Sequence, residues 1–126
     1  MALRCLIVDD NDHFLQAARR LLEREGITVV GMPSTSAEAL ERFDEWQPDV
    51  TLVDIQLGTE CGVDLARRLA GNRPGEPSNV ILISTYAESD FADLIAEGPA
   101  IAFLSKSDLS AGAIRDILRR AGHDRG

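Results

Sequence analysis

Short apolar runs alternate along this sequence with longer segments whose apolar residues recur at helical spacing. The runs show little polar alternation, which is typical of strands that are covered on both faces. The expected strands are residues 4–8, 28–30, 50–53, 80–83 and 100–104. Strands that alternate with helices of about 10 to 15 residues indicate parallel pairing through right-handed crossovers. We therefore expect an α/β fold with helices on both faces of one sheet.

The helical segments carry recognisable start and stop signals. Gly26 follows the first apolar stripe, and Thr35 with Glu38 forms a capping box at the start of the second. The expected helices are 14–22, 35–46, 63–70, 91–95 and 110–121. In the second helix, Phe43 and Trp46 stand at helical spacing, and we expect both to pack in the core.

Composition limits the classes of protein that the chain can belong to. Its 126 residues, 44% of them hydrophobic, predict a single globular domain over 1–126, with a core over about 3–121 and no output domain. The net charge of −8 argues against direct nucleic-acid binding. The first apolar segment ends at Asp9, too early for a signal peptide or a membrane span. We expect a cytoplasmic protein.

Polar side chains stand where four of the expected strands end. Asp9 and Asp10 follow the first strand, Asp54 the third, Ser84 the fourth, and Lys106 comes shortly after the fifth. A doubly wound, five-stranded parallel sheet of flavodoxin-like order 2-1-3-4-5 makes strands one and three neighbours at the switch point, where such sheets bind ligands. This order brings the three aspartates together, with the serine and the lysine across the sheet edge.

Three carboxylates in one pocket are difficult to ionise together without a compensating cation. Mg²⁺ suits such a site, because it prefers oxygen ligands, needs few carboxylates and keeps water positions open. A nearby lysine and a hydroxyl suit a phosphoryl group, whose oxygens accept a point charge and a hydrogen bond. Each of these residues alone is typical of a solvated loop, and the hypothesis depends on their arrival at one edge.

With these motifs in this order, the chain resembles the receiver domains of response regulators in two-component signalling. The resemblance covers essentially the whole chain, and its motifs are LIVDD, VTLVDIQL, ILIS and FLSK. It implies that Asp54 is the phosphoacceptor for a histidine kinase or a phosphotransfer protein. It also implies that Asp10 binds Mg²⁺ directly, Asp9 largely through water, and Gln56 through its backbone carbonyl.

The resemblance further implies a switch. Lys106 would contact the phosphoryl oxygens, Ser84 would be the switch hydroxyl, and Phe103 the aromatic residue that turns inward on phosphorylation. Output would leave through the face built from the fourth helix, the fifth strand and the fifth helix, toward a downstream protein or a homodimer partner. The protein would be a signalling switch and not an enzyme.

The sequence departs from the commonest receiver pattern near the acceptor. Leu57 and Gly58 replace a frequent Met-Pro pair, so we expect a looser loop. The resemblance implies that Gln56, Thr85 and Tyr86 flank the path of a water that attacks the phosphoryl group. Gln56 is uncharged and the other two add bulk, which predicts a long-lived phosphoryl group. The alternative is that Tyr86 points away from this path and packs on the fourth helix.

Two other functions stay open at this point. The chain could be a scaffold that keeps the fold without phosphorylation. It could also be a hydrolase of small phosphoesters, although Gln56 stands where phosphatases with an Asp-x-Asp loop have a second aspartate.

Overall fold

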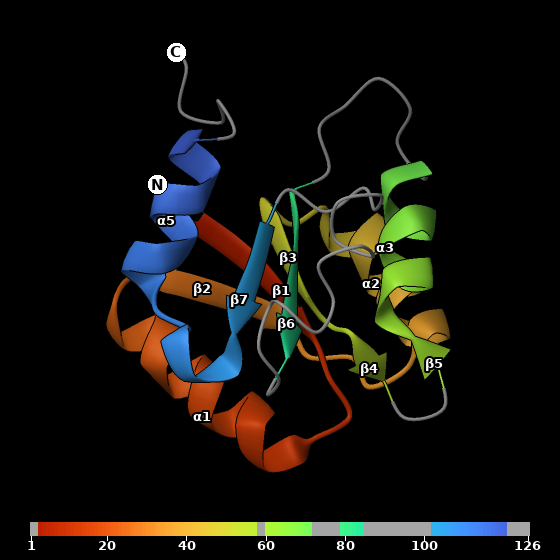
Figure 1. Cartoon of the computed structure of the whole chain (residues 1–126), viewed down its shortest axis with the longest axis horizontal. Coiled ribbons are helices and arrows are strands. Elements are labelled where there is room, and N and C mark those ends of the chain that lie inside the picture. The colour runs from red at the N-terminus through yellow and green to blue at the C-terminus, as the bar shows by residue number, and fades with distance from the viewer. Residues whose placement is uncertain (1–2, 58–59, 72–78, 85–101, 121–126) are drawn as a thin grey trace.

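The computed structural model describes residues 3–57, 60–71, 79–84 and 102–120 (Figure 1). The main strands are β1 (Leu3–Val8), β2 (Ile27–Gly31), β3 (Val50–Asp54), β6 (Val80–Ser84) and β7 (Ala102–Ser105). The helices are α1 (Asp12–Arg24), α2 (Ser36–Trp46), α3 (Gly62–Gly71) and α5 (Ala111–Arg120), with a 3-10 helix η2 (Lys106–Asp108). The helix predicted at 91–95 and residues 100 and 101 of the predicted last strand lie outside the described residues.

The main sheet has five parallel strands in the order β2-β1-β3-β6-β7. Since β6 and β7 are the fourth and fifth strands of this sheet along the chain, the observed order is the predicted 2-1-3-4-5. The predicted fold class is therefore confirmed. The strand order reverses between β1 and β3, so the crevice for a ligand is expected at the carboxyl ends of these two strands.

A second, smaller sheet follows the third strand, and the sequence did not predict it. β4 (Gln56–Leu57) pairs in antiparallel fashion with β5 (Glu60–Cys61). Leu57 is buried, which anchors this short hairpin to the body of the protein. The looser loop was expected at Leu57 and Gly58. Leu57 is instead held by its burial and by the strand pairing, and Gly58 lies outside the described residues.

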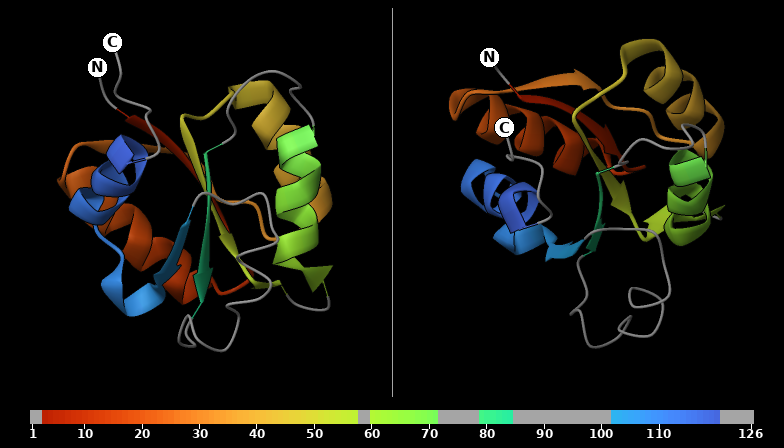
Figure 2. Two further views of the ribbon diagram at one scale, coloured as in Figure 1. Left: turned by 45° about the horizontal axis from the view of Figure 1, so that its top comes forward. Right: turned by 90° about the horizontal axis from the view of Figure 1, so that it is seen from above.

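Two hydrophobic clusters fill the two faces of the main sheet. Alternate residues of each strand point to opposite faces, so Cys5 and Ile7 enter one cluster while Leu6 and Val8 enter the other. Helices α1 and α5 cover the first face, and α2 and α3 cover the second (Figure 2). Removing a central side chain such as that of Leu52, which is fully buried, costs about 2–5 kcal/mol in proteins of this kind.

The helix ends follow the sequence signals closely. The Thr35 hydroxyl accepts a hydrogen bond from the Glu38 amide at 3.2 Å, as a capping residue should. Phe43 is buried, but Trp46 at the end of α2 is 42% exposed, so its predicted core position was wrong. The helix ends there because Gln47 adopts a left-handed conformation, with φ of 47°. No helix in the described ranges is long and apolar enough to cross a membrane.

Candidate functional site

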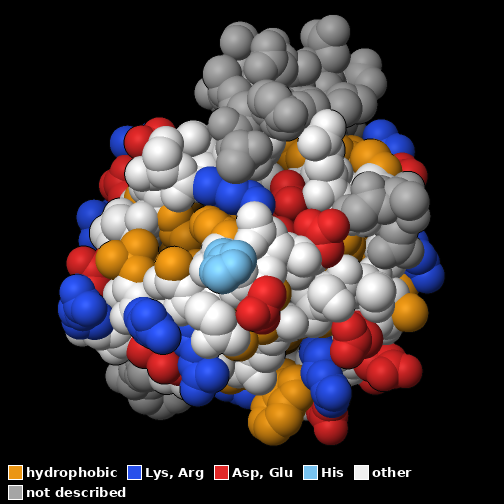
Figure 3. Space-filling model, turned by 90° about the horizontal axis from the view of Figure 1, so that it is seen from below, with side chains coloured by type: hydrophobic (Ala, Val, Ile, Leu, Met, Phe, Trp, Pro, Cys, Tyr) orange, Lys and Arg blue, Asp and Glu red, His pale blue; other side chains and the backbone are white. Residues whose placement is uncertain are grey.

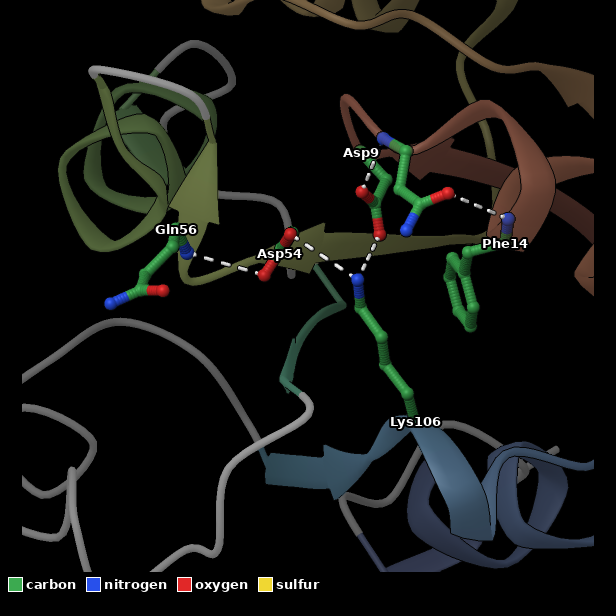
Figure 4. A network of polar contacts seen from close by, with 6 residues as sticks. Asp9, Phe14, Asp54, Gln56 and Lys106 are labelled. Carbon is green, nitrogen blue, oxygen red and sulfur yellow. Dashed lines mark hydrogen bonds and ion pairs between the residues drawn. The ribbon is translucent and has the colours of Figure 1, made fainter.

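The carboxyl ends of the main strands bring the predicted polar residues to one edge. Asp9 directly follows β1, Asp54 is the last residue of β3, and Ser84 is the last residue of β6. Lys106 begins η2, immediately after β7. Figure 4 shows its side chain extending between the carboxylates of Asp9 and Asp54. In the space-filling view of this face, basic and acidic side chains adjoin, with apolar side chains beside them (Figure 3).

Asp9, Asp10 and Asp54 form an acidic cluster whose ligand oxygens all lie within 4.8 Å of one another. Asp9 and Asp54 are buried, whereas Asp10 is exposed. This donor set fits a hard divalent cation such as Mg²⁺, because all of its potential ligands are carboxylate oxygens. The exposed position of Asp10 leaves one side of the cluster open to water, which a hydrated Mg²⁺ needs.

Lys106 provides the positive charge in this pocket. Its Nζ lies 2.7 Å from Oδ2 of Asp9 and 3.4 Å from Oδ2 of Asp54, and its side chain is only 12% exposed. Oδ2 of Asp9 is buried and accepts no well-aligned hydrogen bond from the described residues, so its contact with the ammonium group is an ion pair without good hydrogen-bond geometry. The ammonium group therefore compensates the charge of Asp9 more closely than that of Asp54.

The protonation of Asp54 is shifted by its surroundings. The pKa of this carboxyl is raised from its ordinary 3.8 to about 6, chiefly because the group is buried and next because Asp9 is negatively charged. The charge of Lys106 and the hydrogen bond from the Gln56 amide, at 3.2 Å, act in the opposite sense. Near neutral pH the carboxylate is mostly ionised but poorly compensated, so a cation in the cluster would stabilise it.

The turn between β1 and α1 is tied together by two side-chain hydrogen bonds. Oδ1 of Asp9 accepts from the Asn11 amide at 2.9 Å, and Oδ1 of Asn11 accepts from the Phe14 amide at 3.1 Å, which caps α1. The Phe14 ring then lies beside Lys106, with 4.5 Å from Nζ to the ring centroid. The acidic turn thus presents both a carboxylate and an aromatic ring to one ammonium group (Figure 4).

Gly62 supports the backbone of Asp54 from the other side. Its amide donates to the Ile55 carbonyl at 2.7 Å, and a Cβ atom at this position would collide with the Asp54 carbonyl oxygen. Only a glycine lets α3 begin this close to the end of β3. The position of the Asp54 backbone therefore depends on the absence of a side chain at Gly62.

The remaining predicted site residues are placed only in part. Ser84 is buried and pairs in register with Ser105 of β7. Phe103 is partly buried and packs against the cluster beneath α2 and α3. Gln56 is exposed in β4, where its amide contacts Asp54. Thr85 and Tyr86 lie outside the described residues.

Sequence reasoning missed three contributors to this edge: Phe14, Asn11 and Gly62. Phe14 counted only as an apolar position of the first helix, and nothing local links it to Lys106. One signal was available, because Lys106 is the only lysine in the chain, whose other strongly basic residues are all arginine. A lone lysine among arginines indicates a position where a compact point charge matters.

The comparisons with known proteins agree with this geometry. The family model of the response regulator receiver domain matches residues 5–119. The chain belongs to this family. Receiver domains are signalling domains of two-component systems; they are typically phosphorylated on an aspartate and bind Mg²⁺ in an acidic pocket.

Individual relatives support the same family. The chain is 35% identical over 121 residues to the transcriptional regulatory protein CseB of Streptomyces coelicolor, covering 94% of this chain and 50% of that protein. The chain spans about half the length of this relative and of its counterpart in Streptomyces avermitilis.

Solved structures resemble the chain over nearly its whole length. A CheY-like receiver domain protein from Methanospirillum hungatei JF-1 is 27% identical, with a TM-score of 0.74 over 98% of this chain and 93% of that chain. The receiver domain of the putative response regulator NarL from Mycobacterium tuberculosis is also 27% identical, with a TM-score of 0.77 over 98% of both chains.

Proposed function

We propose that this chain is a phosphorylation-activated signalling switch whose phosphoacceptor is Asp54. The supporting observation is the pairing of a buried, poorly compensated Asp54 carboxylate with Lys106 at the carboxyl end of the central strand β3. The carboxylate oxygen would attack the phosphorus of a phosphohistidine. A P–O bond forms as the P–N bond breaks, and the histidine nitrogen keeps the electron pair. Lys106 and Ser84 would hold the transferred phosphoryl oxygens.

The acidic cluster would hold Mg²⁺ through Asp10, through Asp9 largely by way of water, and through Asp54 and the backbone carbonyl of Gln56. The ion would supply positive charge against the phosphoryl oxygens. The chain's own residues set up this arrangement, since β1 and β3 place the carboxylates side by side and β4 ties the Gln56 amide to Asp54.

The output would be read by another protein. Phosphorylation would bias a two-state equilibrium in which Ser84 and Phe103 change position and alter the output face at β7 and α5. The fourth helix expected at this face, 91–95, lies outside the described residues. The partners would be a sensor histidine kinase or phosphotransfer protein and a downstream protein, with a homodimer as a further outcome. The chain, whose full sequence carries a net charge of −8, would not bind DNA directly, and a cytoplasmic location belongs to the same proposal.

A small phosphodonor such as acetyl phosphate tests this function. With Mg²⁺, intact-mass analysis should show one phosphoryl group per wild-type chain and none on Asp54→Asn. A scaffold would gain no phosphoryl group, and a phosphoester hydrolase would turn over many donors per chain. A stable adduct on Asp54→Asn would show that another residue is the acceptor.

The lifetime of the phosphoryl group is a separate part of the proposal. Gln56 is no strong general base, and Thr85 and Tyr86 add bulk, so we expect slow hydrolysis and slow loading from small donors. The decay rate of the phosphorylated protein should rise in Thr85→Ala and Tyr86→Ala. Equal decay rates in the wild type and both variants would show that these side chains do not obstruct the attacking water.

A further inference from the structure

Within the described residues, an aromatic ring lies beside the ammonium group of Lys106 in addition to two carboxylates. Asp9 lies 2.7 Å and Asp54 3.4 Å from Nζ, while the Phe14 ring centroid lies at 4.5 Å. A cation within about 6 Å of an aromatic centroid is attracted by the electron-rich face of the ring. Phe14 is thus part of the environment of the lysine as well as an apolar residue that packs against the first core cluster.

The backbone that carries the Phe14 ring is held in place independently of Lys106. The capping hydrogen bond from the Phe14 amide to Asn11, and the hydrogen bond from the Asn11 amide to Asp9, fix the first turn of α1 relative to the Asp9 carboxylate. The lysine, by contrast, carries its charge on a stem with four rotatable bonds. A rigid ring beside a flexible stem is suited to restricting where the charge can lie.

The Phe14 ring can still contact the ammonium group when a metal ion occupies the carboxylates. A divalent cation in the acidic cluster would draw on Asp9 and Asp54, the same two carboxylates that hold the ammonium group. The two positive charges would then compete for the same oxygens and repel each other. The aromatic face is the contact that a hard, oxygen-preferring cation does not take.

We propose that Phe14 is a positioning residue for Lys106: its ring keeps the ammonium group inside the pocket, beside the acceptor carboxylate, when a metal ion occupies the acidic cluster. This inference rests on the proposed function of Asp54 and Lys106 and adds a residue to it. The ring touches neither the phosphoryl donor nor the acceptor, and acts only through the lysine. Loss of the ring should therefore slow phosphorylation only while Lys106 is present.

The lone lysine makes a direct measurement possible. Selective labelling with ¹³C,¹⁵N-lysine gives a single side-chain spin system in the NMR spectrum. Protons over an aromatic face resonate upfield of their free-lysine positions, so the Hε signals of Lys106 should lie upfield without Mg²⁺ and stay upfield at saturating Mg²⁺. In Phe14→Leu they should move to the free-lysine position, and in Phe14→Tyr they should stay upfield.

A matched control separates positioning from packing. Phe43→Leu makes the same change at a buried phenylalanine of the other core cluster. It should lower stability but leave the Lys106 signals where they are. If the Hε signals of the wild type lie at the free-lysine position with Mg²⁺, or if Phe14→Leu leaves them upfield, the proposal is wrong.

Phosphorylation kinetics give a second readout. Contacts of this class correspond to factors of about 2 to 30, so Phe14→Leu should slow phosphorylation by acetyl phosphate about 3- to 10-fold, and Phe14→Tyr should restore it. In a Lys106→Met background the same Phe14→Leu change should alter the rate less than about twofold. An equal slowing in both backgrounds would show that Phe14 acts on the fold and not through the lysine.

The two proposals fail in different ways. If wild-type protein takes up no phosphoryl group on Asp54, the proposed function fails, whatever the NMR signals show. If the wild type is phosphorylated but the Hε signals of Lys106 do not shift in Phe14→Leu, only the proposed role of Phe14 is wrong.

Discussion

Replacing Asp54 with asparagine removes a negative charge from a buried site while keeping the shape of the side chain. The Asp54 side chain is 9% exposed, and the nearby carboxylate of Asp9 repels it. Asparagine can still accept the hydrogen bond from the Gln56 amide. In metal-free protein near neutral pH, we therefore expect Asp54→Asn to be more stable than the wild type.

The size of this effect follows from the raised pKa of Asp54. The interval between the ordinary value of 3.8 and the folded value of about 6 corresponds to about 3 kcal/mol when the carboxyl is fully ionised. This figure already includes the favourable contact between the Asp54 carboxylate and Lys106, which the variant gives up. Because an amide only approximates a protonated carboxyl, we expect a gain of about 1–3 kcal/mol. For a domain of this size, 1 kcal/mol shifts the melting temperature by about 4 °C.

The effect has a defined pH window. Below 3.8 the carboxyl is protonated in both the folded and the unfolded state, so it adds no difference between the two proteins. Between 3.8 and about 6 the folded protein holds a proton that the unfolded chain has lost, so the stability of the wild type falls as pH rises. Above about 6 the deficit of the wild type is complete and constant.

Urea denaturation of both proteins in EDTA, at several pH values between about 3.5 and 8, measures this difference. Taking the difference between the two proteins removes the contribution of groups that titrate alike in both. A pH-independent difference, or a less stable variant near neutral pH, would refute the account of Asp54 as a poorly compensated charge. Saturating Mg²⁺ should reduce the difference in unfolding free energy between the two proteins, because the ion binds the folded wild type more tightly than the variant.

Asp10→Ala should lower Mg²⁺ affinity about tenfold or more by calorimetric titration and leave metal-free stability level or higher, with a smaller loss for Asp9→Ala; unchanged affinity would remove the acidic cluster as the metal site. Lys106→Met should raise Mg²⁺ affinity several-fold while slowing phosphorylation, because the ammonium group no longer competes for the carboxylates; weaker Mg²⁺ binding would contradict that competition. Gly62→Ala should destabilise the protein by about 2 kcal/mol or more in urea denaturation, since its Cβ would collide with the Asp54 carbonyl. A loss below about 0.5 kcal/mol would show that α3 can move away without cost.

Strands and their order were predictable because they depend on patterns that are local in the sequence. Continuous apolar runs mark covered parallel strands, and the alternation with helices fixes the topology to a few possibilities. The edge that collects Asp9, Asp54 and Lys106 followed from that topology alone, since the carboxyl ends of parallel strands share one edge.

Features that depend on short elements or distant contacts were not predictable. Two-residue strands such as β4 and β5 are too short to show periodicity, so their pairing leaves no signal in the sequence. The contact between Phe14 and Lys106 joins the first turns of α1 to the start of η2, and only the folded sheet brings them together. The closer approach of Lys106 to Asp9 than to Asp54 likewise depends on side-chain geometry.

The single lysine has a practical consequence for the chemistry of the whole molecule. Apart from the amino terminus, Lys106 carries the only primary amine in the chain, and it is enclosed by two carboxylates and a ring. Amine-directed reagents should therefore acylate Lys106 slowly while the chain is folded. The rate of acylation at Lys106 then reports how often the pocket opens. An ordinary labelling reagent can therefore show whether a variant or a bound ligand leaves the pocket closed.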